Sequence, residues 1–402
     1  MRHRQHRPKA SDATSSPPCS RLVLCFALAL CTILGSAGWT TFAEEGEEDG
    51  SYELRTIGEL ADQEIVSRDL EDLSEDLTPG ERLRIVLRYR ENVDAQALAD
   101  AAGASVLDDF QAFQTAVVEV DSDRLEELLS DAGVDYAVPN RELRLGSITI
   151  RSEESDSESD GAEGDAGDLS DLMPSLASHV RATTGSNQQS WLDRAMVEGV
   201  RGITVAVVDS GVAEHPALAT GEGGLSRVVL HRDFTGEAPL PSGSSHDPYG
   251  HGTHVAGLLA GNGAGSGDVA HQRPFTGIAP FAKIVDLRVI GSEGTGEIDS
   301  LLRALDWLLA NHEQVGVDVV NLSVGTIPQE PHDEDPLCLA VERLVEAGIS
   351  VVVAAGNFGE DEQGNRIYGS VLSPGTAPSA VTVGAATTYA TDGRSDDSVA
   401  DY

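Results

Sequence analysis

An aspartate and a histidine stand where two elements of the chain are expected to end and to begin. Asp209 closes the apolar run Ile203 to Val208, and His251 opens the stretch Gly250-His251-Gly252-Thr253-His254-Val255-Ala256-Gly257. A carboxylate that accepts a hydrogen bond from an imidazole keeps it in the tautomer that can take a proton from a nucleophile. The pattern therefore favours nucleophilic catalysis with Asp209 and His251 as a cooperating pair.

Zinc binding and dinucleotide binding use similar residues, but the spacing of the residues in this sequence disfavours both functions. His254 follows His251 by three residues, which can place two zinc ligands on one helix face, but no glutamate completes an H-E-x-x-H pattern. A dinucleotide-binding fold requires G-x-G-x-x-G directly after the strand, and Asp209-Ser210-Gly211-Val212 does not supply it. We predict no metal site here and interpret His254 as structural.

In these segments the chain resembles the subtilisin-like serine proteases, the subtilase family, and His215-Pro216-Ala217-Leu218 matches the family's turn as well. The resemblance implies that Asp209 orients the imidazole and that His251 is the general base. It also implies that Asn357, in Ala354-Ala355-Gly356-Asn357, donates to the oxyanion. An asparagine of an ordinary turn is the alternative interpretation. The expected reaction is hydrolysis of protein or peptide substrates through an acyl-enzyme, without a cofactor.

Two further segments match the substrate cleft of that family. Ser323-Val324-Gly325 resembles a wall of the primary specificity pocket, and Gly294-Thr295-Gly296 resembles the extended segment that pairs with a substrate backbone. Backbone pairing gives affinity with little sequence demand, whereas pockets add selectivity. By the same resemblance, Leu372 lies near the base of the pocket, where it would favour small or medium apolar side chains.

The Gly-Thr-Ser segment that carries the family's nucleophile has no match in this sequence. It should follow the expected strand 380–383, and Ser398 to Tyr402 resemble the segment that leads toward it. We therefore expect a chain that is C-terminally truncated before the nucleophile and is inactive as given. The alternative function is a non-catalytic relative that keeps the subtilisin fold as a binding or secretion module.

The elements that must position these residues are strands and helices, which are expected to follow one another in turn through residues 173–402, the predicted catalytic domain. Continuous apolar runs, rather than alternating ones, suit strands that are covered on both faces. Such runs occupy 203–208, 283–290, 317–324, 350–355 and 380–383, with helices expected at 298–311 and 335–347. The predicted fold is α/β, a doubly wound parallel sheet of the subtilisin-like type. Asp209, Ser323 and Asn357 all fall at strand carboxyl ends, where such sheets place functional groups.

A small α+β domain is predicted at residues 81–146. Its elements follow the order β-α-β-β-α-β, which is that of a ferredoxin-like unit. In front of a subtilisin-like domain, this unit resembles the family's inhibitory propeptide. The resemblance implies a zymogen whose own propeptide is an intramolecular inhibitor with its C-terminal tail in the substrate cleft. An unrelated small domain is the alternative.

Three polar or apolar segments complete the predicted organisation. Residues 1–43 combine basic residues with the apolar run Leu22 to Leu34, as a signal peptide does, and imply a secreted, extracellular protein. An uncleaved membrane anchor is the alternative, so we expect contact with a membrane only through this export signal. Residues 44–80 are acidic and are predicted to be a mobile pro-region without a core, and residues 147–172 to be an acidic, solvated linker.

Composition limits the partners and the cofactors. The formal net charge is −40, and the only lysines are Lys9 and Lys283, so the surface repels nucleic acid. Calcium is possible because the family often binds it through carboxylates, but no spacing identifies a site. Of the four cysteines, only Cys338 lies after the leader, so we expect a packed core thiol and no intramolecular disulfide in the mature region.

Overall fold

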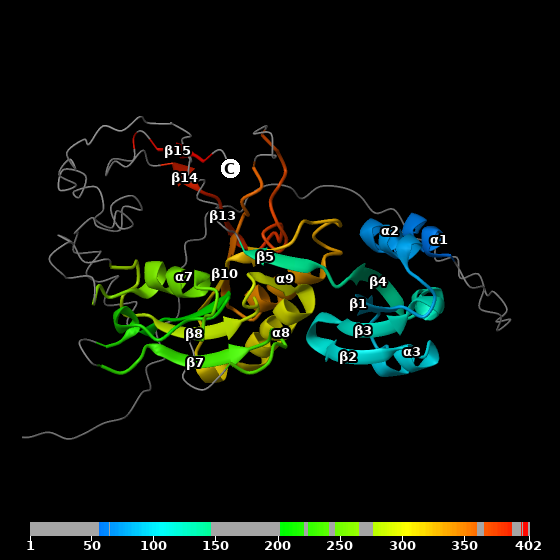
Figure 1. The fold of residues 1–402 in the computed structure, drawn as a ribbon, viewed down its shortest axis with the longest axis horizontal. Coiled ribbons are helices and arrows are strands. Elements are labelled where there is room, and N and C mark those ends of the chain that lie inside the picture. The colour runs from blue at the N-terminus through cyan, green and yellow to red at the C-terminus, as the bar shows by residue number, and fades with distance from the viewer. Residues whose placement is uncertain are drawn as a thin grey trace, which may run out of the picture. The chain divides into compact units, whose positions relative to one another are not determined.

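The structure, a computed structural model, describes residues 56–145 apart from 64, residues 202–387 apart from 221–223, 241–245, 265–275 and 360–365, and residues 395 and 397–400. The predicted signal peptide (1–43) and acidic linker (147–172) lie outside the described residues. The described residues form an N-terminal α+β domain and a C-terminal α/β domain, both within one compact unit (Figure 1).

The N-terminal domain is built on an antiparallel sheet with the strand order β2-β3-β1-β4. Its elements are β1 (Arg82–Tyr89), α3 (Ala95–Ala101), β2 (Ser105–Phe110), β3 (Thr115–Asp121), α4 (Leu125–Leu129) and β4 (Val134–Pro139). Asp94 begins α3 by accepting hydrogen bonds from the backbone N–H groups of Gln96 and Ala97, as helix N-caps do. The predicted ferredoxin-like order is confirmed.

Two helices precede this sheet, and they correct one prediction. α1 (Ile57–Asp62) and α2 (Arg68–Asp76) lie in the acidic segment 44–80, which we predicted to lack a core. Leu60 and Leu70 are both 0% exposed and belong to the apolar cluster that lines the sheet. The prediction is therefore wrong for residues 57–76. A helix with few apolar residues is stable when another part of the chain supplies the surface it packs on.

The C-terminal domain contains a six-stranded sheet, ordered β13-β12-β10-β6-β8-β7, whose neighbouring strands are all parallel. Its strands are β6 (Thr204–Asp209), β7 (Val228–Asp233), β8 (Lys283–Arg288), β10 (Val319–Leu322), β12 (Ser350–Ala354) and β13 (Val381–Val383). Two strands, β8 and β7, lie on one side of β6, and β10, β12 and β13 lie on the other side. The carboxyl end of β6 is therefore the point where the strand order reverses, a common location for functional sites.

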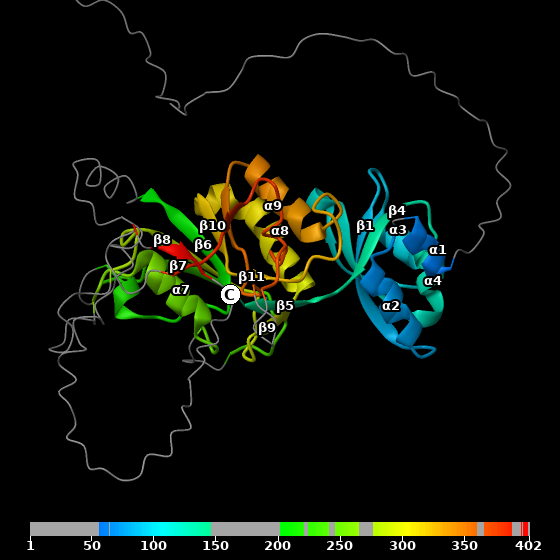
Figure 2. The same ribbon diagram turned by 90° about the horizontal axis from the view of Figure 1, so that it is seen from above.

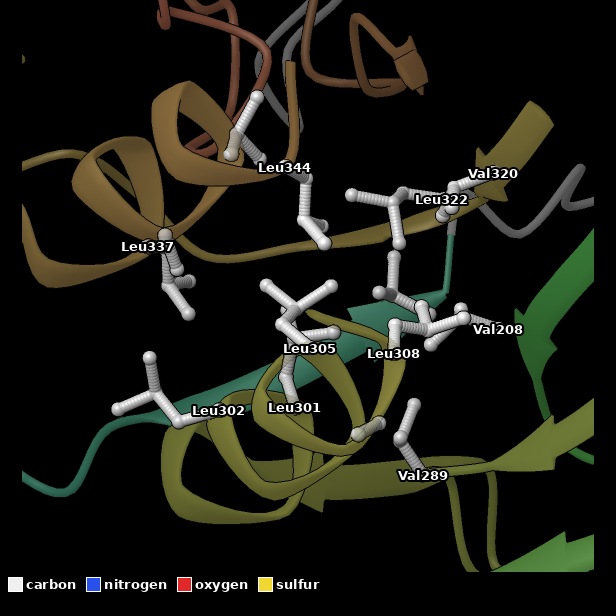
Figure 3. Packing of buried hydrophobic residues seen from close by; sticks show 14 of the residues in the cluster. Val208, Val289, Leu301, Leu302, Leu305, Leu308, Val320, Leu322, Leu337 and Leu344 are labelled. Carbon is white, nitrogen blue, oxygen red and sulfur yellow. The ribbon is translucent and has the colours of Figure 1, made fainter. Parts of the chain in front are cut away.

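Helices cover both faces of this sheet, which confirms the doubly wound α/β fold. They are α7 (His251–Ala260), α8 (Ile298–Val315) and α9 (Pro336–Glu346). Leucines of α8 and α9 point toward Val208, Val320 and Leu322 on one face (Figure 3). Ala256 and Ala260 of α7 pack with Val205 and Val207 on the other face. α8 runs four residues beyond the predicted end at 311 and stops at Gly316, whose left-handed conformation ends the helix.

The described residues include no helix that is both long enough and apolar enough to cross a lipid bilayer.

Candidate active site

Asp209 and His251 meet at the junction of a strand and a helix. Asp209 is the last residue of β6, and His251 is the first residue of α7. His251 Nδ1 lies 2.8 Å from Asp209 Oδ1 and 3.0 Å from Oδ2. The side chain of Asp209 is fully buried, whereas that of His251 is 20% exposed, so the far side of the imidazole is accessible. The predicted Asp–His pair is thus present, oriented as a general base requires.

The close approach of the two elements depends on Gly252. A side-chain carbon added at Gly252 would lie 2.1 Å from the carbonyl oxygen of Gly211 and 3.0 Å from Asp209 Cβ. Any larger residue would push α7 away from the end of β6. The glycine that follows His251 is therefore required for the hydrogen bond between the pair.

The environment of His251 favours the charged imidazolium. Burial opposes the charge, but the hydrogen bond and negative charge of Asp209 outweigh it, and Asp247 adds a smaller attraction. The pKa of His251 is consequently raised above its ordinary value. An imidazole with a raised pKa accepts a proton readily, and the imidazolium that forms is stabilised.

Asp247 and Ser210 hold the pair in place, and neither residue was among the predicted site residues. Asp247 accepts hydrogen bonds from Ser210 Oγ (2.8 Å), Gly250 N (2.7 Å) and Thr253 N (2.8 Å). Ser210 Oγ in turn accepts one from Gly252 N at 3.0 Å. These bonds fasten the loop after β6 to the first turn of α7. An aspartate four residues before the histidine was the available sequence signal, but its partners are visible only in the fold.

A second pair of a histidine and a carboxylate lies on neighbouring strands of the same sheet. His231 of β7 lies opposite Asp286 of β8 in the strand register, and His231 Nδ1 is 2.8 Å from Asp286 Oδ2. Asp286 is 2% exposed, and burial raises its pKa to about 6 despite the nearby histidine. No sequence motif indicated this pair.

Asn357 lies at the same edge of the sheet as Asp209. In the parallel register Val208 is opposite Leu322, and Leu322 is opposite Val353. Asn357 therefore follows β12 on the side where Asp209 ends β6. Its Nδ2 is buried and has no hydrogen-bond partner among the described residues. Its role at the oxyanion stays a prediction, and an amide without a partner is what that role requires.

The two predicted substrate-binding segments form the outer strands of a small sheet. β9 (Thr295–Glu297) includes Thr295 and Gly296, with Gly294 in the turn before it, and β11 (Val324–Gly325) follows Ser323. Between them runs β5 (Glu142–Leu145), antiparallel to both (Figure 2). β5 follows the N-terminal domain in the chain. The structure thus brings both segments together around an extended strand of the same polypeptide.

Leu372 fills the space between two glycines beside this sheet. A side-chain carbon added at Gly356 would lie 2.6 Å from Leu372 Cγ, and one added at Gly325 would lie 2.8 Å from Leu372 Cβ. Leu372 is 4% exposed and, with Arg144 and Phe358, lines a cavity of about 290 Å³ next to β11. The leucine therefore occupies volume next to the segment that resembles a pocket wall.

Charged side chains link the N-terminal domain to this region. Arg141 lies 2.6 Å from both Asp69 of α2 and Glu330, whose side chain is 1% exposed. Arg84 of β1 contacts Glu297 (2.9 Å) and Asp299 (3.2 Å), the latter in the first turn of α8. Arginine recognises carboxylates through several hydrogen bonds at once. These pairs orient the N-terminal domain against both sides of the small sheet.

The remaining predicted features concern cysteine and metals. Cys338 is buried in α9 with its sulfur 3.3 Å from Thr376 Oγ1, and burial raises its pKa to about 12. It is a core thiol, as predicted. Within the described ranges, no group of three or more His, Cys, Asp or Glu residues has an arrangement that could hold a metal ion. Calcium binding stays a prediction without assigned residues.

Comparison with known proteins identifies both domains. Residues 200–401 match the Subtilase family, and residues 76–140 match the Fervidolysin N-terminal prodomain. The chain is 33% identical over 226 residues to the serine protease AprX of Bacillus subtilis (strain 168), covering 55% of this chain and 46% of AprX. It is also 33% identical over 209 residues to subtilisin Savinase of Lederbergia lenta, covering 52% and 59%. The chain thus spans about half the length of these relatives.

The fold agrees with a solved structure. Fervidolysin from Fervidobacterium pennivorans superposes with a TM-score of 0.51 at 21% identity, covering 80% of this chain and 45% of fervidolysin. At this identity the likeness shows the fold alone. The two family matches establish that this chain belongs to the subtilase family of serine proteases and carries a fervidolysin-like prodomain in front of the catalytic domain.

Proposed function

We propose that the chain is the precursor of a secreted serine endopeptidase that hydrolyses peptide bonds through a Ser-His-Asp acyl-enzyme mechanism. The observation that carries this proposal is the hydrogen bond between His251 and the buried Asp209, at the sheet edge where the strand order reverses. The strands β9 and β11, which pair with an extended segment, supply the place for a substrate backbone.

Each named side chain has one task in the proposed reaction. His251 removes the proton of a serine hydroxyl as the serine attacks the peptide carbonyl, and later returns the proton to the leaving amine. Asp209 keeps the imidazole in the required tautomer and stabilises the imidazolium. Asn357 Nδ2 donates to the carbonyl oxygen as it becomes negative. The attacking serine is not assigned to a residue of this sequence, and the proposed reaction requires no cofactor.

The prodomain acts as an intramolecular inhibitor in this proposal. β5 uses the backbone hydrogen-bonding groups of β9 and β11 that a substrate strand would need. The main-chain oxygen of Arg141 and the side chain of Asn140 also accept hydrogen bonds from Ile298 N and Asp299 N, at the start of α8. These contacts keep β5 in the cleft until the chain is cut after it. The protein is therefore made as a zymogen.

Secretion is the proposed destination of the mature enzyme. The N-terminal sequence has the pattern of an export signal, and a relative of the catalytic domain is the minor extracellular protease Epr of Bacillus subtilis (strain 168), 33% identical over 200 residues.

A single substitution in the protein expressed from its complete coding sequence tests the proposed function. Asp209→Asn keeps the shape of the side chain but favours the wrong imidazole tautomer, so we expect kcat on casein to fall about 10⁴-fold. Glu313→Gln, on the exposed side of α8, is the matched control and should leave kcat unchanged. If the unaltered protein hydrolyses no protein substrate while its prodomain is removed, it is a non-catalytic binding or secretion module instead.

A further inference from the structure

Two histidine rings are stacked beside the loop that carries Asp247. The ring centroid of His246, the residue before Asp247, lies 4.0 Å from that of His231, and the two ring planes differ by 14°. His231 belongs to β7 and is half-buried, whereas His246 is exposed to solvent. One ring is therefore fixed to the sheet, and the other can take a proton directly from solvent.

Carboxylates lie next to the inner ring of this stack. His231 Nδ1 is 2.8 Å from Asp286 Oδ2, and His231 Nε2 is 4.0 Å from Glu214 Oε1. Glu214 is exposed, but Asp286 is 2% exposed, and its Oδ1 has no hydrogen-bond partner among the described residues. In the register of the sheet Asp286 is opposite Val207, two residues before Asp209. Since alternate residues of a strand share a face, the stack lies on the face of the sheet that carries the catalytic aspartate.

The charge of this cluster changes in the range where histidines titrate, about pH 5 to 8. Burial and the adjacent His231 lower the pKa of His246 below its ordinary 6.5, against the attraction of Glu214. Burial raises the pKa of Asp286 to about 6. Acidification below pH 6.5 therefore adds positive charge to the stack while it removes the negative charge of Asp286. Two charged rings at this distance repel each other.

The other charged groups near the stack have partners of their own. Arg288, two residues after Asp286 on β8, contacts Asp233 and Glu237. The carboxylate of Asp247 accepts hydrogen bonds from the main chain and hydroxyls around it, and its charge acts on His251. The attraction that favours a charge on the outer ring comes from the exposed Glu214, where solvent and salt screen it.

The main chain of His246 packs directly against the loop that follows Asp209. A side-chain carbon added at Gly211 would lie 2.0 Å from the carbonyl oxygen of His246 and 3.1 Å from Asp247 Cα. Asp247 accepts the hydrogen bonds that fasten this loop to the first turn of α7. A displacement of His246 would therefore move the contacts on both sides of the catalytic pair.

We propose that the stack of His246 on His231 is an acid-sensitive switch for catalysis. With His246 neutral, the stack keeps Asp247 where it fastens the loop after β6 to α7. A proton on His246 breaks the stack and displaces Asp247. The alignment of Asp209 with His251 is then weakened until the proton leaves. The proposal rests on the proposed protease function and adds a regulation of the same site.

His246→Phe tests the switch in the active enzyme expressed from its complete coding sequence. Phenylalanine keeps a flat ring on His231 but cannot take a proton, so activity at about pH 8 should be unchanged. The ratio of kcat/KM at about pH 5 to that at about pH 8, measured on dye-labelled gelatin, should be about tenfold higher than in the unaltered enzyme, an effect typical of coupled sites. His332→Gln removes an exposed histidine and is the matched control, which should keep the unaltered ratio.

His246→Ala separates the loss of the proton from the loss of the stack. It removes the ring altogether, so it should lower kcat about tenfold even at about pH 8, with little change in KM, because the catalytic pair is displaced. Full kcat in this variant would overturn the proposal, and so would a loss of activity in acid that is not regained on return to about pH 8.

Amide hydrogen exchange separates this inference from the proposed function, because it requires no catalysis. The N–H groups of Gly250 and Thr253 donate to Asp247. Their protection, relative to an unstructured chain, should fall about tenfold between about pH 8 and about pH 5 in the unaltered protein and stay constant in His246→Phe. Hydrolysis of gelatin with the same pH dependence in both proteins would overturn the inference alone. A protein that shows this difference in exchange but hydrolyses nothing would overturn the proposed function alone.

Discussion

The catalytic pair and the substrate cleft are assembled in different ways. Asp209 and His251 are 42 residues apart, and the residues that hold them, such as Asp247, belong to the same region of one domain. The middle strand of the cleft comes from the prodomain, and it is secured by contacts such as Arg141–Glu330, 189 residues apart. Because the two regions are held by different contacts, removing the prodomain should change access to the site without changing the geometry of the catalytic pair. Variants of the catalytic pair and of the substrate cleft test whether the two regions are independent.

Among the variants that test this separation, the largest effect is expected from Arg141→Ala in the prodomain. The substitution leaves Glu330 buried without its partner, and burial already raises the pKa of that carboxyl. Losing one member of a buried, hydrogen-bonded charge pair should weaken prodomain binding by about 2–5 kcal/mol. Inhibition of the mature enzyme by separately added prodomain measures this change, provided that circular dichroism shows the isolated prodomain to be folded.

Arg124→Ala is the control for this variant, because Arg124 forms an exposed pair with Glu127 on the prodomain. Its effect should be below about 1 kcal/mol. If prodomains with Arg141→Ala and with Arg124→Ala inhibit the mature enzyme equally well, the buried pair of Arg141 and Glu330 does not secure the prodomain.

Asp247→Ala should damage the catalytic pair while leaving the cleft unaltered. The backbone and hydroxyl donors around Asp247 lose their acceptor, so the loop after β6 is no longer fastened to α7. A displacement of about 1 Å can reduce catalysis about 100-fold. We therefore expect kcat to fall by this amount with little change in KM. A rise in KM at constant kcat would instead place Asp247 in substrate binding.

Leu372→Gly should alter only the selectivity of the cleft. It removes the side chain that stands between Gly325 and Gly356, so the pocket for the residue directly before the cut should deepen. The preference should move from small or medium apolar residues toward large ones by about tenfold, as measured with a peptide library.

Leu344→Ala, which removes a fully buried leucine of α9, is the control for Leu372→Gly and should lower stability without changing this preference. A marked preference of the unaltered enzyme for arginine or lysine before the cut would contradict the assignment of Leu372 to the pocket.

The smallest expected effect is a shift in the pH dependence of kcat/KM, caused by Asp247→Asn. The general base must be neutral, so kcat/KM should fall as the pH decreases through the pKa of His251, which Asp209 and Asp247 hold above its ordinary 6.5. Asp247→Asn removes one of these charges and should move the acidic limb to lower pH. An acidic limb below pH 6.5 in the unaltered enzyme would contradict the assignment of His251 as the titrating base.

Local sequence was sufficient to predict much of the catalytic domain. The apolar run before Asp209 predicted a buried strand, and the glycines around His251 predicted a helix start close to it. Both predictions depend on residues near one another in the chain. The family resemblance added Asn357 and the two cleft segments that contain β9 and β11, whose pairing with a strand the structure shows.

Other features were decided only by the tertiary structure. The helices α1 and α2, the contacts of Asp247 and Asp286, and the place of β5 between β9 and β11 all depend on partners distant in the sequence. Hydrophobic periodicity shows which face of an element is buried but not which surface covers it. A buried carboxylate is stabilised by the donors that the fold gathers around it, and no local pattern names them. The sequence therefore determined the chemistry of the pair, while the fold decided how the pair is held and which strand occupies the cleft.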